Sequence, residues 1–258
     1  MIAGDIIKNL IAQAQRHGKF DDDAFVAAQS ALPFESRETV RYAPDVARLY
    51  FGVDVPPGVA SKYYFWDNTT LSLKAPLLAL VADGARVLEI GPGSAATLSI
   101  LLAKHRKNVR ITCAEINREF IPTARAIAGY NEADLTIVES DMGSGIAGEF
   151  DAVFMNPPYV TVANLAKLNI DRRSHEGRSG DGGEDGCRVV AQFLREIPGL
   201  LRPDGVALLG VNTRHLGDDV VTDRITKSRF RLDRRWYPDA AVQPRGVHSQ
   251  VYVLRRRD

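Results

Sequence analysis

The stretch that decides the fold is residues 86–96, which read Arg-Val-Leu-Glu-Ile-Gly-Pro-Gly-Ser-Ala-Ala. Its first five residues form an apolar run typical of a buried strand, and a helical pattern continues from its end to His105. Between the two lies a G-x-G-x-x-G/A turn, whose glycines let the backbone bend sharply and approach a ligand closely. We therefore expect Gly91 and Gly93 to contact a nucleotide-like cofactor at this turn.

Strand and helix patterns alternate through the remainder of the chain. We expect helices over residues 94–105, 118–130 and 186–201, and strands over residues 86–90, 109–114, 135–139, 150–155, 206–211, 232–237 and 249–254. Such alternation predicts an α/β fold with a Rossmann-like, seven-stranded, doubly wound parallel sheet, which binds ligands at the carboxyl ends of its strands. Residues 174–186, rich in glycine, arginine and acids, are expected to form a mobile loop over those ends.

The first 70 residues have a different pattern. Short helical periodicities cover residues 4–16, 21–30 and 36–50. No strand alternation appears before Ala85. We therefore expect a small N-terminal helical domain over residues 1–70 and the α/β domain over residues 71–258. The aromatic residues 63–66 lie at the junction, where packing between the domains is favoured over a role in lining the substrate site.

Composition and charge narrow the class of protein. The 258 residues are 45% hydrophobic and 25% charged, as in ordinary soluble domains, and the formal net charge is +1. This balance argues against a nucleic-acid partner, because phosphate contacts dominate nucleic-acid affinity. No apolar run reaches the roughly 20 residues that cross a bilayer, so we expect a cytoplasmic protein without a membrane partner. Cys113 and Cys187 lack neighbours at zinc-ligand spacing, so no metal site is expected.

Carboxylates lie at the ends of the first three predicted strands. Glu89 precedes the glycine turn, where it would oppose a pyrophosphate but suit the cationic amino acid end of S-adenosylmethionine. Glu115 lies 22 positions after Gly93, near the spacing of an acid that holds ribose hydroxyls. Asp141 is placed to accept from an adenine amino group, and the N–H of Met142 to bond a ring nitrogen. Each acid alone is more often a solvated loop residue, but the series favours S-adenosylmethionine over NAD(P).

Asn156-Pro157-Pro158-Tyr159, which we call the NPPY loop, follows the apolar run of the fourth strand. Both prolines have a fixed φ and no N–H, and Pro157 forces Asn156 into an extended conformation. We expect the Asn156 side-chain oxygen and the Pro157 carbonyl to accept the two hydrogens of a substrate NH2 group and to aim its nitrogen. Tyr159 would stack on the planar group, and Asn156 would also contact the cofactor. The plain alternative is a proline-rich turn with Tyr159 packed in the core.

With these motifs in order, residues 60–258 resemble the class I S-adenosylmethionine-dependent N-methyltransferases of the HemK/PrmC type. Gly182-Gly183-Glu184-Asp185-Gly186 is similar to the G-G-x-D-G segment that follows the NPPY loop in that family. The resemblance implies methyl transfer to the side-chain amide of a glutamine in a protein, such as the GGQ glutamine of a peptide chain release factor. It also implies that the N-terminal helical domain recognises the protein substrate.

Two departures from the family pattern leave other acceptors open. Residues 66–70, Trp-Asp-Asn-Thr-Thr, stand where the family has Pro-Arg-Pro-x-Thr-Glu, and the Glu-Pro that follows the NPPY loop is absent between Val160 and Gly182. One alternative is methylation of a small molecule or peptide in a biosynthetic pathway. Another is methylation of an exocyclic amino group in nucleic acid, for which an unstacked base would enter the loop. A binding module without catalysis is disfavoured by the intact Asn156 loop.

Overall fold

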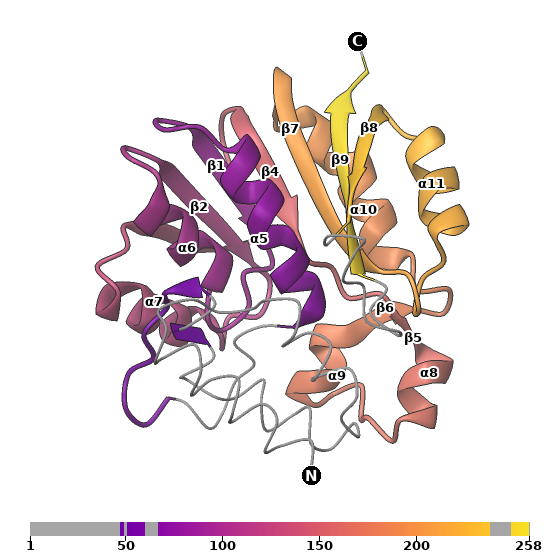
Figure 1. The fold of residues 1–258 in the computed structure, drawn as a ribbon. Coiled ribbons are helices and arrows are strands. Elements are labelled where there is room, and N and C mark those ends of the chain that lie inside the picture. Colours follow the sequence, from indigo (N-terminus) through magenta and orange to yellow (C-terminus); the bar gives the residue numbers. More distant parts are fainter. Residues whose placement is uncertain (1–46, 49–50, 60–66, 238–248, 258) are drawn as a thin grey trace, which may run out of the picture.

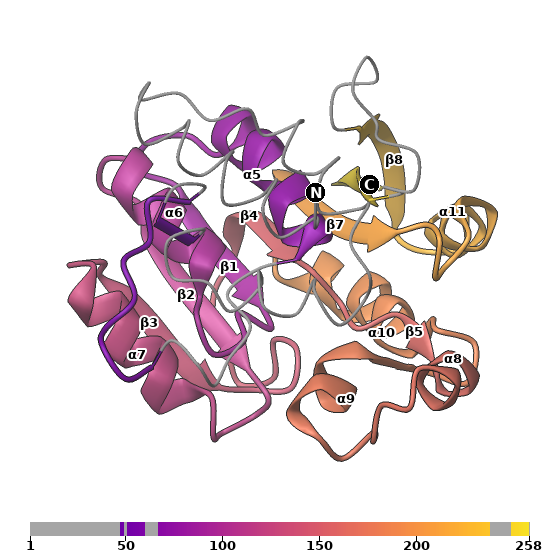
Figure 2. The same cartoon turned by 60° about the horizontal axis from the view of Figure 1, so that its bottom comes forward.

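The structure is a computed structural model, and it describes residues 47–48, 51–59, 67–237 and 249–257. A seven-stranded sheet runs through this part of the chain in the order β3-β2-β1-β4-β7-β9-β8 (Figure 1; β3 is labelled in Figure 2). Its strands are β1 (Arg86–Ile90), β2 (Arg110–Glu115), β3 (Leu135–Glu139), β4 (Phe150–Met155), β7 (Leu201–Asn212), β8 (Phe230–Trp236) and β9 (Ser249–Arg256). The predicted α/β fold with a seven-stranded sheet is therefore confirmed.

Most neighbouring strands of the sheet are parallel, but β9 is not. β1 pairs in parallel with β2 and β4, and β4 pairs in parallel with β7. β9 is antiparallel to both of its neighbours, with Tyr252 opposite Leu209 of β7 and Arg235 of β8. The prediction of a parallel sheet is therefore confirmed for most of its strands and wrong at β9, because strand direction depends on how the chain connects the strands and not on their local apolar pattern.

Helices cover both faces of the sheet and give three layers (Figures 1 and 2). One face carries α5 (Asn68–Leu80), α6 (Thr97–His105) and α7 (Ile121–Tyr130), and the other carries α10 (Arg188–Glu196), the 3-10 helix η1 (Ile197–Gly199) and α11 (Asp218–Thr226). Side chains alternate between the two cores along the central strands: Phe154 of β4 packs in the first and Val153 in the second. Burial on both faces explains why the central strands are almost continuously apolar.

Most of residues 174–186 fold into a short helix and a short strand. α9 (His175–Gly180) is followed by β6 (Asp181–Gly183), which pairs in parallel with β5 (Val160–Thr161), the strand that leads into α8 (Val162–Lys167). Oδ2 of Asp181 accepts from Nε and Nη2 of Arg172 at 3.0 and 2.8 Å, and Oδ1 accepts from the Gly183 N–H at 2.9 Å. The expectation of a loop is therefore wrong over residues 175–183, where these bonds and the strand pairing support a helix and a strand.

Residues ahead of α5 join the core of the α/β domain. Ala47, Phe51 and Val53 are buried in the same cluster as the apolar residues of α5 and α6. The N–H of Asp54 donates to Oδ1 of Asn131 at 2.8 Å. The greater part of the predicted helical domain, together with residues 63–66, lies outside the described residues, and that domain stays a prediction. In the part of the chain that is described, no helix combines the length and the apolar character needed to cross a membrane.

Candidate active site

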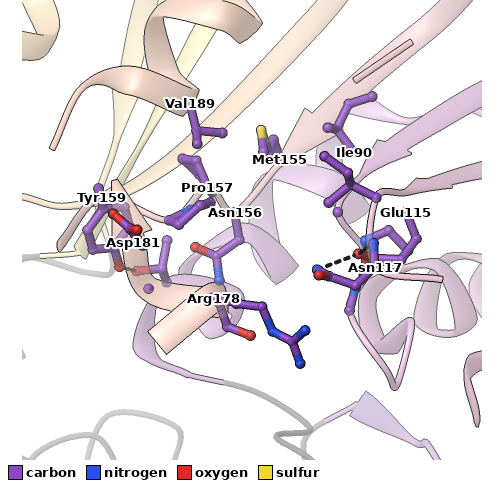
Figure 3. Close-up of a pocket in the computed structure, with 18 of the residues that line it drawn as sticks. Ile90, Glu115, Asn117, Met155, Asn156, Pro157, Tyr159, Arg178, Asp181 and Val189 are labelled. Carbon is purple, nitrogen blue, oxygen red and sulfur yellow. Dashed lines mark hydrogen bonds between the residues drawn. The ribbon is translucent and has the colours of Figure 1, made fainter. Parts of the chain in front are cut away.

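A cavity of about 570 Å³ opens at the carboxyl ends of the central strands (Figure 3). Among its lining residues are all those predicted for the site: Glu89, Gly91, Gly93, Glu115, Asp141, Met142, Asn156, Pro157 and Tyr159. α9 and α10 add Arg178 and Gln192 to the lining. Segments far apart in the sequence thus meet where a sheet of this kind binds its ligands.

The turn after β1 needs its glycines. Gly91 and Gly93 both have a φ of 65°, in the left-handed region where a side chain is strained. Ala96 also has a positive φ of 48°, so α6 begins at Thr97, later than predicted. Oγ of Ser94 is buried in the cavity wall and finds no hydrogen-bond partner among the described residues. A buried hydroxyl is costly to leave unpaired, so this atom fits a polar ligand in the cavity.

Glu89 is buried at the end of β1, with 6% of its surface exposed. It accepts a hydrogen bond from Oγ of Ser99 on α6, and that oxygen in turn accepts from the Cys113 thiol at 3.2 Å. Burial raises the pKa of Glu89 to about 7, although the bond from Ser99 lowers it. A cation placed beside such a carboxyl would favour its charged form, so the site suits a positively charged ligand group.

Glu115 links the end of β2 to the glycine turn. Its Oε2 accepts from the Gly93 N–H at 2.9 Å, and its Oε1 accepts from the backbone N–H and Nδ2 of Asn117 at 2.8 and 3.0 Å (Figure 3). Burial raises the pKa of Glu115, while these donors lower it. The protein's own donors therefore use much of the acceptor capacity that the sequence predicted for ribose hydroxyls.

The turn after β3 carries the third acid. Oδ1 of Asp141 accepts from Nε2 of Gln192 on α10 at 2.9 Å. Met142 has a left-handed φ of 53°, and Oγ of Ser140 hydrogen-bonds to the carbonyls of Met142 and Ser144 at 3.1 and 2.9 Å. Ser140 and Gln192 are absent from the sequence predictions. The serine before the Asp-Met pair was a readable turn signal, whereas nothing in the sequence pointed to Gln192.

The side-chain amide of Asn156 is held by the start of α5. Its Nδ2 donates to Oδ1 of Asp67 at 3.0 Å and to Oγ1 of Thr70 at 3.1 Å. Asp67 is also the N-cap of α5, because the same oxygen accepts from the Thr70 N–H at 2.6 Å. Sequence reasoning noticed these residues only as a departure from the family pattern and missed their contact with Asn156.

Tyr159 is packed more tightly than a free stacking platform would be. Only 7% of its surface is exposed, and its ring stacks on His215 with the centroids 6.2 Å apart. Its hydroxyl hydrogen-bonds to Oγ1 of Thr69 at 2.7 Å. These contacts support the packing role that the sequence left as an alternative. Because Tyr159 also lines the cavity, its stacking on an acceptor stays a prediction.

The glycines of residues 182–186 lie against the backbone of the NPPY loop. A Cβ on Gly182 would lie 2.6 Å from Cα of Tyr159, and one on Gly186 would lie 2.7 Å from the Tyr159 carbonyl oxygen. Gly186 also has a φ of 75°, which a side chain would strain. The two positions need glycine because the loop backbone leaves no room for a side chain.

Comparisons with known proteins agree with this geometry. Residues 53–172 match the sequence profile of the methyltransferase small domain. A protein of Methanocaldococcus jannaschii that is named "putative protein N5-glutamine methyltransferase" is 32% identical over 147 residues, which are 57% of this chain and 71% of the relative. A release factor glutamine methyltransferase of Deinococcus radiodurans is 29% identical over 130 residues, which are 50% of this chain and 46% of the relative. This chain thus spans about half the length of that second relative.

A solved structure supports the fold. The crystal structure of a methyltransferase from Pyrococcus furiosus superposes with a TM-score of 0.60 over 86% of this chain and 98% of that one. The two sequences are 21% identical, so the likeness bears on the arrangement of helices and strands alone.

Proposed function

This chain belongs to the class I S-adenosylmethionine-dependent N-methyltransferases of the HemK/PrmC type, and from that premise we propose that it methylates the side-chain amide nitrogen of a glutamine in a protein. The specific acceptor that we propose is the GGQ glutamine of a peptide chain release factor, since the relative from Deinococcus radiodurans is named a release factor glutamine methyltransferase and the family resemblance implies that glutamine. A release factor acts in translation, so the proposal includes a cytoplasmic location.

The orientation of Asn156 is the observation that carries this proposal. Both donor contacts of its Nδ2 go to Asp67 and Thr70, which turns Oδ1 of the amide away from them. Asn156 lines the cavity, and we infer that this oxygen serves there as a hydrogen-bond acceptor. A primary amide offers two N–H groups in one plane, and the Pro157 carbonyl on the same loop would accept the second.

The described lining fits S-adenosylmethionine, which supplies an electrophilic methyl group when bound. We assign the buried Glu89 carboxyl to the cationic amino group and the Ser94 hydroxyl to the neighbouring carboxylate of the cofactor. Glu115 would accept from the ribose, next to Gly93. Asp141 and the N–H of Met142 would contact the adenine. Gly91 would let the backbone approach the amino acid end.

Catalysis would depend on positioning. An amide nitrogen is a poor nucleophile, because its lone pair is delocalised into the carbonyl group. Asn156 and Pro157 would accept its two hydrogens and fix the nitrogen in line with the methyl group, so that orientation and fixed dipoles supply most of the rate enhancement. The nitrogen releases one proton after the transfer, which restores a neutral amide.

A labelling experiment tests the function. The full-length protein is incubated with tritiated S-adenosylmethionine and, in separate reactions, a release factor, its GGQ Gln→Ala variant, RNA, DNA and a metabolite extract. We expect one methyl group on the GGQ glutamine, located by mass spectrometry, and none on the variant. Transfer to the extract or to a nucleic acid, with no transfer to the release factor, would overturn the proposed acceptor.

Replacing Glu115 should weaken cofactor binding. Glu115→Ala removes the acceptor of the Gly93 N–H as well as the proposed ribose contact, so the affinity for S-adenosylhomocysteine should fall by about 1.5–3 kcal/mol, the range for a charged hydrogen-bond group. Calorimetry measures the change. Glu139→Ala is the matched control, because Glu139 ends β3 but is exposed and pairs with Arg118. Equal affinities for the wild type and a folded Glu115→Ala protein would refute the assignment.

Cofactor affinity should depend on the protonation of Glu89. In the free protein its carboxyl titrates near pH 7, so below that pH it is neutral and cannot pair with a cation, while above it the charged form is present. A proton then competes with the ligand, and affinity at pH 6 should be roughly tenfold lower than at pH 7.5. Calorimetric titration across this range measures the effect.

Glu89→Gln provides the control for the pH dependence. The glutamine does not titrate, so the variant should bind weakly at both pH values and lose the slope. An equally steep fall in the variant would assign the titration to another group.

A further inference from the structure

We propose that Asp67 and Thr70 are positioning residues for methyl transfer, which hold the Asn156 carboxamide with its oxygen toward the acceptor nitrogen. All three residues line the cavity. Asp67 and Thr70 belong to residues 66–70, where the chain departs from the HemK/PrmC pattern, so the departure itself would build part of the site. The catalytic consequence rests on the proposed function, because it requires Asn156 to accept from the substrate amide.

The polarity of the contacts allows only one orientation of the amide. An ionised carboxylate has no hydrogen to donate, so the group of Asn156 that faces Asp67 must be its nitrogen. The hydroxyl of Thr70 donates its one hydrogen to Oδ1 of Asp67 at 2.8 Å. Its oxygen can therefore only accept from Nδ2 of Asn156, at 3.1 Å. Both partners thus present acceptors to the nitrogen.

A flipped amide would be harmful to the reaction. It would turn the NH2 group of Asn156 toward the NH2 group of the substrate, so that two donors faced each other. It would also place Oδ1 of Asn156 against the carboxylate of Asp67. The bond to a charged acceptor further polarises the amide, which makes its oxygen a better acceptor on the cavity side.

The position of Asp67 makes this orientation rigid. Asp67 caps α5 through the Thr70 N–H, so its side chain has a fixed place relative to the helix. α5 in turn packs on the sheet through buried Leu73 and Leu77. Asn156 lies 89 positions after Asp67 in the sequence. The position of its amide is therefore fixed by contact with a packed helix as well as by its own loop.

Two substitutions separate positioning from helix capping. Asp67→Ser keeps an N-cap residue of similar strength but is too short to reach Asn156. Thr70→Val keeps the side-chain shape and the capped backbone N–H but removes the oxygen. Each variant should unfold at nearly the wild-type denaturant midpoint, bind S-adenosylhomocysteine normally and lose about 10- to 100-fold in kcat. Asp83→Ser is the control, since Asp83 likewise accepts from a backbone N–H, that of Lys107, but lies in an exposed turn.

A double-mutant cycle tests whether the effect passes through Asn156. In single-turnover reactions, Asp67→Ser should cause no further loss of rate in an Asn156→Ala background, because the group that it positions is gone. A loss of the same size in both backgrounds, or wild-type kcat in both single variants, would overturn the positioning role.

An NMR measurement that does not require methyl transfer tests this proposal separately from the proposed function. The side-chain 15N–1H signals of Asn156, identified by their loss in Asn156→Ala, should shift and exchange faster in Asp67→Ser and stay unchanged in Asp83→Ser. Unchanged signals in Asp67→Ser would refute the anchoring of the amide. Altered signals in a protein that transfers no methyl group to any release factor would refute the proposed acceptor and leave the anchoring in place.

Discussion

An Asn156→Ala protein should lose about 10²- to 10³-fold in kcat, the size of effect seen when one oriented hydrogen-bonding group is removed from an active site. Its affinity for S-adenosylmethionine should change little, because Glu89 and Glu115 remain. The fold should also persist, since Asp67 still accepts from the N–H and hydroxyl of Thr70. A loss in kcat at nearly constant cofactor affinity is the kinetic signature of a group that acts in the transition state.

Asn164→Ala is the matched control for this experiment. Asn164 lies on α8, the helix that follows the same loop, and its side chain is outside the described lining of the cavity. The control should keep wild-type kcat and cofactor affinity. Wild-type turnover by Asn156→Ala would show that the asparagine only closes a turn, and a parallel loss of cofactor affinity would assign it mainly to cofactor binding.

The central part of the fold could be predicted from the sequence because its strands are buried on both sides. β1 and β4 have the predicted bounds, since each is an apolar run between turn residues. The edge strand β3 also has the predicted bounds, although Ile137 alone of its residues is buried. The short elements β5, β6, α8 and α9 were missed. Their regular structure depends on contacts such as that between Asp181 and Arg172, which no local sequence pattern reveals. Strand direction at β9 was missed for the same reason.

Some polar groups of the site could likewise be predicted from the sequence, and others could not. Glu89, Glu115 and Asp141 could be found because strand ends of a parallel sheet converge, so acids at successive ends must lie together. The groups that hold the site residues in place could not be found. Ser99 contacts Glu89 from a neighbouring helix, and Asp67 contacts Asn156 from 89 positions away. Such pairs are set by the packing of whole elements and leave no periodic trace in the sequence.

Gly182→Ala should damage the site without touching any ligand. Its Cβ would lie 2.6 Å from Cα of Tyr159 and 2.7 Å from the carbonyl oxygen of Gly186, and neither backbone can yield as a flexible side chain would. The NPPY loop must therefore shift or β6 must separate from β5. We expect a loss of about 1–3 kcal/mol in the free energy of unfolding, as for other overpacked sites.

The same shift of the loop should also slow methyl transfer, because Asn156 lies three residues before Tyr159 on a stiff loop. A displacement of about 1 Å at an orienting group can cost 10²-fold, so kcat should fall by about that factor in the folded variant. Gly129→Ala is the control: Gly129 is helical, and its added Cβ would meet nothing within 4 Å. That substitution should raise the free energy of unfolding by about 0.5–1 kcal/mol and leave turnover unchanged. If residue 182 acts through backbone contact with the NPPY loop, denaturant titration should show opposite changes in the free energy of unfolding for the two alanine variants, and single-turnover labelling should show a loss of rate in Gly182→Ala but not in Gly129→Ala.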